Sequence, residues 1–178
     1  PQQEPLGPTL LPPGPAEGEA TMQTLLMPLL ERAEATASLQ GRPWRGPDLW
    51  PQWIDQPSQD GTIAEIVANL LENAFRYSPA GCSVGLCLLP DGLCVWDNGP
   101  PIPLEERDLI FERGARGSTG QDRAGTGLGL ALARSLAEQQ GRKLTLCVEP
   151  STIAPDLPAQ GNAFVLSWPA GARPDPTT

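Results

Sequence analysis

Residues 62–77 are TIAEIVANLLENAFRY, followed by SPAG at 78–81. The apolar residues recur at three- and four-residue steps, which predicts one buried face of an α-helix. These residues are Ile63, Ile66, Val67, Leu70, Leu71 and Ala74. Thr62, with Glu65 three residues on, matches a capping box and predicts where the helix begins. Pro79 and Gly81 predict its end.

The opposite face of this helix carries an unusual set of polar side chains. Asn69, Glu72, Asn73 and Arg76 fall at i, i+3, i+4 and i+7, so two amides, a carboxylate and a guanidinium share one side. Solvated outer faces have this composition most often, and a polar binding site is the other interpretation. The helix alone does not decide between them.

The length of 178 residues allows one domain with extensions, and the 22 prolines are unevenly placed. Residues 1–19 and 169–178 are rich in Pro and Gly and are predicted to be flexible flanks. The folded part is therefore expected at about 20–168. Because the chain begins without Met, we also expect that it is a fragment of a larger protein.

Charge and residue usage exclude several classes of function. The net charge of -9 argues against nucleic-acid binding and against contact with an anionic membrane surface. No apolar run approaches about 18 residues and no signal peptide is visible, so we expect no membrane contact by this segment. Histidine is absent, which removes histidine acid–base chemistry, histidine metal sites and a histidine phosphoacceptor within this chain. The four cysteines lie in apolar, strand-like segments without CxxC spacing and are predicted to be buried reduced thiols. They are Cys82, Cys87, Cys94 and Cys147.

Periodicity along the rest of the chain predicts further helices and strands. Helices are expected at 21–39, interrupted or begun near Pro28 and stopped by Gly41, at 104–111, and at 128–140. In the last helix the inward residues are expected to be Leu128, Leu132, Ala133, Leu136 and Ala137. Strands are expected at 49–54, 82–89, 93–96, 143–149 and 162–168. The predicted fold is an α/β two-layer sandwich, a mixed and mostly antiparallel sheet of four or five strands covered on one face by two or three helices.

Residues 112–127, ERGARGSTGQDRAGTG, contain five glycines and almost nothing apolar, which predicts a mobile loop. Glycines that end at a helix start present backbone N–H groups and the positive end of a helix dipole, as in a phosphate cradle. A plain flexible loop fits equally well on glycine content. A P-loop is excluded because Lys143 is the single lysine and no GxxxxGK[ST] occurs.

Three features in this order resemble the N, G1 and G2 boxes of the GHKL ATPases: Asn73 on the polar helix face, Asp97 followed by Gly99, and GTGLGL at 125–130. The segments NLLENAFRYSPAG, DNGPPIP, IFERGARG and GTGLGLALARSLAEQQG are similar to the catalytic ATP-binding domain of bacterial sensor histidine kinases. The resemblance runs from about residue 60 to 168 and implies a Bergerat-type sandwich.

The resemblance also implies roles for residues of the helix at 62–77. Asn73 would give an amide oxygen to Mg²⁺, which prefers oxygen ligands. Arg76 would contact phosphate, and Tyr77 would lie near the ribose or base. Asn69 would share the polar face, and Glu72 would orient water, so that Glu72, Asn73 and Arg76 form the catalytic set.

Beyond that helix, Asp97 would accept a hydrogen bond from the adenine amine, which guanine lacks at that position. Gly99 would let the backbone approach the base. Phe111 would anchor a lid formed by the glycine-rich loop, whose arginines would reach the phosphates. The remaining nucleotide-binding residues implied are Ile102, Arg113, Arg116, Gly125, Thr126, Gly127, Leu128 and Gly129.

Two positions depart from the family pattern. Pro101 stands where a glycine is usual, which puts flexibility after Asp97 in doubt. Ala163 stands where a Thr or Ser is common, so no hydroxyl at 163 supports Asp97. Both departures would weaken nucleotide affinity.

The resemblance implies transfer of the γ-phosphoryl group of Mg²⁺–ATP to a histidine outside this chain, for relay to a response regulator. It also implies cytoplasmic location, a helical phosphoacceptor domain as partner and a homodimeric intact kinase. Residues 20–41 resemble the end of a dimerisation helix with its linker, which leaves 42–168 as the ATP-binding domain. The alternatives are an anti-sigma-like or degenerate regulatory module that binds nucleotide and a protein partner, and an interaction domain without nucleotide.

Overall fold

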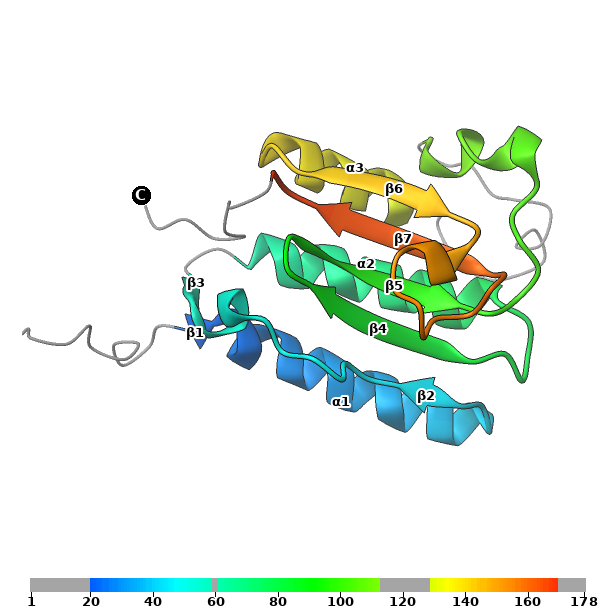
Figure 1. Cartoon of the computed structure of the whole chain (residues 1–178), viewed down its shortest axis with the longest axis horizontal. Coiled ribbons are helices and arrows are strands. Elements are labelled where there is room, and N and C mark those ends of the chain that lie inside the picture. Colours follow the sequence, from blue (N-terminus) through cyan, green and yellow to red (C-terminus); the bar gives the residue numbers. More distant parts are fainter. Residues whose placement is uncertain (1–19, 59–60, 113–128, 170–178) are drawn as a thin grey trace, which may run out of the picture.

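A five-stranded sheet forms the centre of the fold in the computed structural model, which describes residues 20–58, 61–112 and 129–169 (Figure 1). Its strand order is β2-β4-β5-β7-β6. The strands are β2 (Trp44–Arg45), β4 (Val84–Leu89), β5 (Gly92–Asp97), β6 (Lys143–Cys147) and β7 (Asn162–Ser167). β1 (Ala20–Thr21) and β3 (Pro57–Ser58) form a separate antiparallel pair.

The sheet is mixed and mostly antiparallel, as the sequence predicts. β2 pairs parallel with β4, whereas the β4–β5, β5–β7 and β6–β7 pairs are antiparallel. β5 is central, and each of its residues is buried. Alternation along the strands sends Leu86, Val95 and Phe164 toward the helices, where they join the main core.

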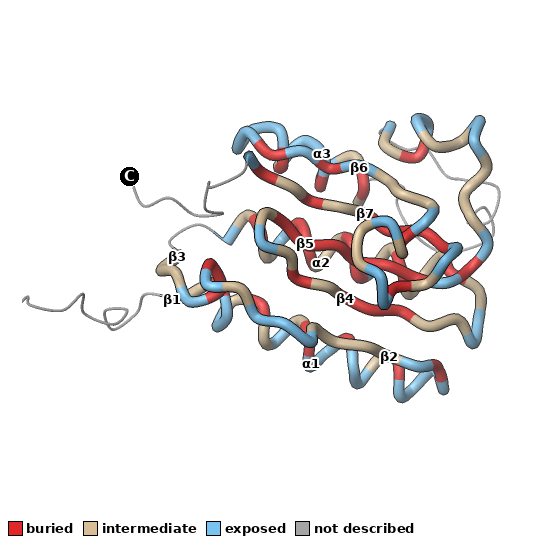
Figure 2. The backbone as a smooth tube through the Cα atoms, in the orientation of Figure 1, coloured by how far each residue is buried: buried red, intermediate tan, exposed pale blue. Residues whose placement is uncertain are grey.

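Three helices cover one face of this sheet: α1 (Met22–Gln40), α2 (Thr62–Tyr77) and α3 (Gly129–Gln139). Figure 1 shows α2 and α3 behind the sheet, and Figure 2 shows buried residues concentrated along the central strands β4, β5 and β7. The six apolar residues predicted for the inner face of α2 are all buried. The predicted two-layer α/β sandwich is therefore confirmed.

α1 belongs to the same packed core as the other helices. Thr21 and Thr24 form a capping box at its start, and Gly41 ends it in the left-handed conformation with φ 65°. Met22, Leu26 and Leu30 are buried in the main core. The helix begins before Pro28 and contains it. The assignment of 20–41 to a dimerisation helix stays a prediction, and the packing adds that α1 covers the same sheet as α2.

Two local predictions about the first half of the chain are wrong. The expected strand at 49–54 is instead a 3₁₀ helix, η2 (Gln52–Asp55), after Pro51. It buries Trp53, whose indole N–H donates to the Leu89 carbonyl at 2.7 Å. The expected capping box at Thr62 is not formed, because Gly61 is the N-cap of α2 and accepts from the Glu65 N–H through its carbonyl.

Two predictions in the second half also need correction. The helix expected at 104–111 is divided into two 3₁₀ turns, η3 (Leu104–Glu106) and η4 (Leu109–Phe111). In α3 the predicted inward residues Ala133 and Ala137 are buried, but Leu130 is buried as well, and Leu132, predicted inward, is 43% exposed. Leu128 lies outside the described residues.

The second face of the sheet is partly covered by the chain between β6 and β7. This segment includes η6 (Pro150–Thr152) and crosses in front of the sheet in Figure 1. Leu157, with Ile153, packs there on Cys94 and Trp96 in a second, smaller apolar cluster. The prediction that the four cysteines are buried is wrong for three of them, because Cys94 alone of the four is buried. Within the described ranges, no helix has the length and apolar character needed to cross a membrane.

Candidate functional site

The end of α2 meets the ends of β5 and β7 around a small hollow lined by polar and apolar side chains. Its volume is about 50 Å³, which is below the roughly 300–1,000 Å³ of ordinary ligand pockets. Its lining consists of Asn73, Tyr77, Ser78, Pro79, Asp97, Pro100, Ile102, Asn162 and Phe164. Four of these residues, Asn73, Tyr77, Asp97 and Ile102, were predicted from the sequence as site residues. A nucleotide base therefore requires this hollow to widen or to be completed by other parts of the chain.

Asp97, the last residue of β5, is a buried carboxylate at this hollow with 6% exposure. Its Oδ1 accepts hydrogen bonds from the Gly99 N–H at 2.8 Å and from the Asn162 side-chain amide at 3.4 Å. Among the described residues, both of these bonds reach Oδ1, which leaves Oδ2 to accept from a ligand. Burial raises the pKa of Asp97, while these two donors and the charge of Arg42 oppose the rise.

Asn162 is a site residue that the sequence analysis did not identify. It stands opposite Asp97 in the β5–β7 register. Its amide donates to the Pro100 carbonyl at 2.9 Å, and its carbonyl accepts from the Ile102 N–H at 2.8 Å. Asn162 thus fixes the chain that leaves β5. The sequence alone could reveal Asn162 only if the strand register were known, because its role depends on lying opposite Asp97.

The structure also changes the interpretation of Ala163. Side chains alternate along β7, so Asn162 shares a face with Asp97 while Ala163 packs with Trp96 in the cluster on the second face. A side-chain hydroxyl at position 163 would therefore lie on the second face of the sheet, opposite the face that carries the Asp97 carboxylate. The expected loss of support for Asp97 is wrong, because Asn162 provides that support.

Replacing Asn162 by leucine tests this arrangement. The change removes a hydrogen bond that stabilises the ionised carboxylate, so we expect the pKa of Asp97 to rise further. Because burial already holds the folded-state pKa above the unfolded one, the folded state gains relative stability as the pH falls through that pKa. Carboxyl ¹³C NMR titration measures the shift. Gln160→Leu, an exposed neighbour, serves as the control, and an unchanged Asp97 titration in Asn162→Leu would contradict the assignment.

Two glycines allow the backbone to close around Asp97. A Cβ on Gly99 would meet Asp97 Oδ1 at 3.0 Å and the Pro79 ring at 2.9 Å. A Cβ on Gly161, which has φ 156°, would come within 2.0 Å of the Asp97 carbonyl oxygen. Gly99 therefore allows the chain after β5 to pass close to the Asp97 carboxylate and Pro79, and Gly161 allows the chain before β7 to approach the end of β5.

We expect Gly161→Ala to lower the free energy of unfolding by about 1–3 kcal/mol, because the added methyl forces β7 away from β5. Urea unfolding followed by circular dichroism measures the change. Gly46→Ala is the matched control, since a Cβ there makes an ordinary contact at 3.6 Å. Equal midpoints for both variants would show that the ends of β5 and β7 adjust without cost.

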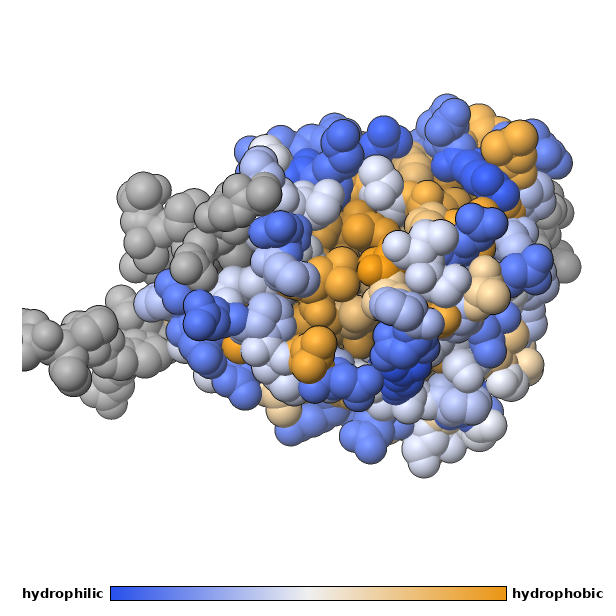
Figure 3. Space-filling view, in the orientation of Figure 1, coloured by the Kyte–Doolittle hydropathy of each residue, from blue (hydrophilic) through white to orange (hydrophobic). Residues whose placement is uncertain are grey.

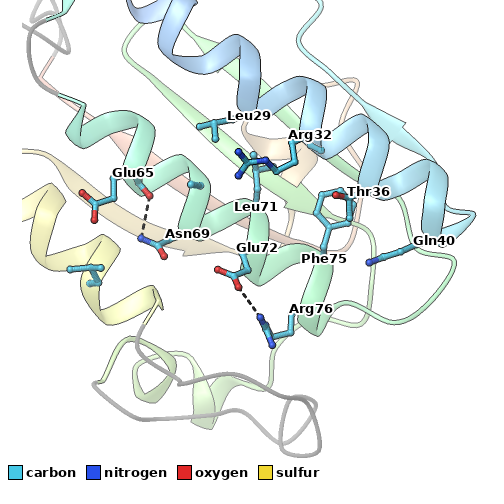
Figure 4. A pocket seen from close by; sticks show the side chains of 13 residues that line it. Leu29, Arg32, Thr36, Gln40, Glu65, Asn69, Leu71, Glu72, Phe75 and Arg76 are labelled. Atoms are coloured by element: carbon cyan, nitrogen blue, oxygen red, sulfur yellow. Dashed lines mark hydrogen bonds and ion pairs between the residues drawn. The ribbon is translucent and has the colours of Figure 1, made fainter.

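The polar residues of α2 do not all face the same hollow. Asn73 and Tyr77 line the hollow beside Asp97, whereas Asn69, Glu72 and Arg76 line a larger groove between α1 and α2. This groove has a volume of about 660 Å³. Figure 4 shows these three side chains on one side of α2, with Arg76 bonded to Glu72 at 2.7 Å. The predicted single stripe therefore divides between two neighbouring hollows.

The start of α3 lies beside this stripe. A Cβ on Gly129, the first described residue of α3, would be 3.6 Å from Asn69 Oδ1. Asn69 itself donates to the Glu65 carbonyl at 3.1 Å. The N-terminal end of α3 thus approaches the polar face of α2, where backbone N–H groups and the helix dipole favour an anion.

Phe111 does not line the hollow itself, but it contacts Phe164, which does. Its ring packs edge-on against Phe164 with centroids 6.0 Å apart, and the Arg134 guanidinium lies 4.9 Å from its centre. Six predicted site residues lie outside the described residues. They are Arg113, Arg116, Gly125, Thr126, Gly127 and Leu128.

Arg42 is a second residue that the sequence analysis missed. Its side chain is buried and bonds the Cys82 carbonyl at 2.9 Å and the Ser78 hydroxyl. The guanidinium also lies 5.5 Å from the centre of the Phe75 ring. Arg42 therefore connects the segment after α1 with the end of α2, next to the hollow.

Comparison with known proteins identifies the family. Residues 59–172 match the model of the histidine kinase-, DNA gyrase B-, and HSP90-like ATPases. The chain belongs to this family, as the resemblance of its motifs predicts.

Two relatives illustrate which proteins this chain is similar to. The chain is 35% identical over 159 residues to the sensor histidine kinase Hik2 of Thermosynechococcus vestitus, a match that covers 85% of this chain and 39% of Hik2. It is 34% identical over 121 residues to the sensor protein KdpD of Escherichia coli, covering 65% of this chain and 13% of KdpD. The chain therefore spans less than half the length of either relative.

Solved structures show the same fold. The mycobacterial sensor histidine kinase MprB aligns with a TM-score of 0.61 at 26% identity, covering 88% of this chain and 99% of that chain. The catalytic domain of histidine kinase ThkA aligns with a TM-score of 0.63 at 21% identity, covering 85% and 94%. The sandwich is the fold of histidine kinase catalytic domains.

Proposed function

We propose that this chain is the ATP-binding catalytic domain of a two-component sensor histidine kinase. In this proposal it binds Mg²⁺–ATP at the hollow beside Asp97 and transfers the γ-phosphoryl group to a histidine outside this chain. The observation that carries the proposal is the Asp97 carboxylate, which is buried at the end of a central strand with Oδ1 bonded and Oδ2 left for a ligand.

The donor set fits an adenine nucleotide. A carboxylate only accepts hydrogen bonds, so it suits the exocyclic amine of adenine and disfavours the carbonyl of guanine. Ile102 and Phe164 give the hollow apolar walls on which a base can pack, and Tyr77 lies beside them. The fold of the chain also aligns with that of ShkA, which was solved in complex with AMPPNP, at a TM-score of 0.64 and 23% identity. This likeness supports the fold of the chain and not its nucleotide contacts.

The residues on α2 fit the phosphate end. Arg76 is a cation held by Glu72, and the start of α3 lies nearby beside Asn69. Asn73 is the proposed amide ligand of Mg²⁺. Among the described residues no group of three His, Cys, Asp or Glu side chains could hold a metal, so the ion would take its other ligands from phosphates and water.

Each residue of this set has a defined task in the proposed reaction. When bound, Mg²⁺–ATP supplies the phosphoryl group. Arg76 neutralises phosphate charge, Glu72 holds Arg76 in place and orients water, and Asp97 fixes the base. The lid contacts of Arg113, Arg116 and the glycines at 125–129 remain predictions.

The partners follow from the same proposal. The phosphoacceptor is a helical domain of the intact kinase. The intact kinase is a homodimer whose catalytic domain lies in the cytoplasm, and it passes the phosphoryl group to a response regulator. The name of Hik2, a sensor histidine kinase, and that of KdpD, a sensor protein, support this assignment. The absence of histidine from the chain requires the acceptor to lie elsewhere.

Incubation with γ-labelled ATP tests the proposed function. The purified chain binds the nucleotide but is expected to remain unlabelled, since it contains no histidine. Filter binding measures the first result, and gel autoradiography after acid and alkali treatment measures the second. Acid-stable label on the chain would indicate a serine or threonine kinase and would contradict the proposal.

A further inference from the structure

Two cysteines stand directly opposite each other on the second face of the sheet. Cys87 on β4 and Cys94 on β5 are partners in the antiparallel register, and both are free thiols. Paired residues point to the same face, and both thiols belong to the cluster with Trp96 and Leu157. Figure 3 shows apolar side chains gathered over the middle of this face.

The backbone spacing of this pair suits a disulfide. Opposed residues of an antiparallel pair have Cα atoms about 4.5 or 5.5 Å apart. Disulfides span Cα separations of about 4.4–6.8 Å. The pair therefore lies within the range without any change of strand register, and the two-residue turn at Pro90 and Asp91 keeps the strands together.

The other two cysteines are not placed for this bond. Cys147 pairs with Ala163 in the β6–β7 register, and β7 separates its strand from β5. Two strand spacings amount to about 9.5 Å, beyond the reach of a disulfide. Cys82 lies before β4, where its N–H donates to the Pro79 carbonyl near the other hollow.

The two opposed thiols differ in access and acidity. Cys87 is half-buried, whereas Cys94 has 0% exposure. Contact with Cys94 lowers the pKa of Cys87 against the opposing effect of burial, and Arg45 also lowers it, whereas the carboxylates of Asp156 and Asp48 raise it. The same contact, together with burial, raises the pKa of Cys94. Cys87 is therefore the thiol that reacts first.

We propose that Cys87 and Cys94 form a modification site for small disulfides of the oxidised glutathione class, which convert the pair to an intramolecular disulfide. The Cys87 thiolate attacks one sulfur of the reagent, whose S–S bond breaks and releases one small thiolate. Cys94 then attacks the Cys87 sulfur and gives its proton to the second small thiolate, which leaves as a thiol. The cysteines lose two electrons and two protons, and the reagent becomes two thiols. This chemistry does not rest on nucleotide binding.

Thiol mapping of the reduced chain of residues 1–178 with oxidised glutathione tests the proposal. The expected product has lost two hydrogens and two of its four thiols, and its peptide map contains Cys87 linked to Cys94. Cys94→Ser, or Cys94→Ala if serine is poorly tolerated, stops at the glutathione adduct of Cys87. Cys87→Ser leaves Cys94 unmodified because it is fully covered. A reducing agent restores both thiols.

Cys147→Ser is the matched control, and the linkage between the opposed cysteines is expected to form in it unchanged. Stable glutathione on Cys87 of the natural chain, or a native-state linkage of either residue to Cys82 or Cys147, would overturn the proposal. So would modification of Cys94 in Cys87→Ser. The mapping of the natural chain decides the question even where a variant folds poorly.

Discussion

Asp97→Asn lowers the affinity for adenine nucleotides by about 10- to 100-fold, which corresponds to the roughly 1.5–3 kcal/mol of a hydrogen bond to a charged group. The amide has one acceptor where the carboxylate has two. If its oxygen faces the Gly99 N–H, its NH₂ group faces the adenine amine; the reverse orientation places the NH₂ group against Gly99. Either orientation leaves two donors facing each other.

Isothermal titration with ADP and Mg²⁺ measures this loss. Asp108→Asn is the matched control, since Asp108 is exposed at the N-terminal side of η4 and lies outside the hollow. The affinity of Asp108→Asn is expected to equal that of the natural chain. Undiminished affinity in Asp97→Asn would remove Asp97 from the site.

Asn73→Ala removes the dependence of nucleotide binding on Mg²⁺ and is expected to weaken binding in its presence by about tenfold or more, which is about 1.4 kcal/mol. The amide oxygen is the one protein ligand that we assign to the ion, and hard cations bind through oxygen. Alanine keeps the helix, because it has the highest helix propensity. The protein therefore loses the ligand without losing the fold.

Parallel titrations with Mg²⁺ and with EDTA measure this effect. Gln139→Ala removes an exposed amide of α3 and serves as the control. The expected pattern is an affinity difference between the two conditions in the control that is lost in Asn73→Ala. A variant that keeps the full Mg²⁺ effect would show that the ion is held elsewhere.

The parts of the fold with strong periodicity were predictable from the sequence. The apolar steps of α2 predicted its six buried residues, and alternation predicted β4, β5, β6 and β7 to within two residues at each end. Short elements were not predictable in this way. Trp53 is apolar enough for a strand, yet it lies in a 3₁₀ turn that aims its indole at the Leu89 carbonyl, a contact 36 residues away in the chain.

Tertiary packing also decided which side of α3 is buried. Leu132 and Leu130 suit an inner face equally well by composition. The close approach of α3 to α2 favours the side with Ala133 and Ala137, so Leu130 is covered and Leu132 is left at the groove between α1 and α2.

The candidate site was predictable where a residue belongs to a local motif. Asn73, Asp97 and Ile102 meet at one hollow although they come from separate segments. Asn162 and Arg42 were missed, since their importance depends on register and burial rather than on neighbours in the chain. The division of the polar stripe of α2 between two hollows follows from the gradual rotation of side chains around a helix, but the walls that separate the hollows come from other elements.

The most direct measurement is the structure of the chain in complex with Mg²⁺ and a non-hydrolysable ATP analogue. We expect the adenine amine at Asp97 Oδ2, the ion on the amide oxygen of Asn73, and the phosphates between Arg76 and the start of α3. An analogue bound in the larger groove between α1 and α2, with no contact to Asp97, would contradict this expectation.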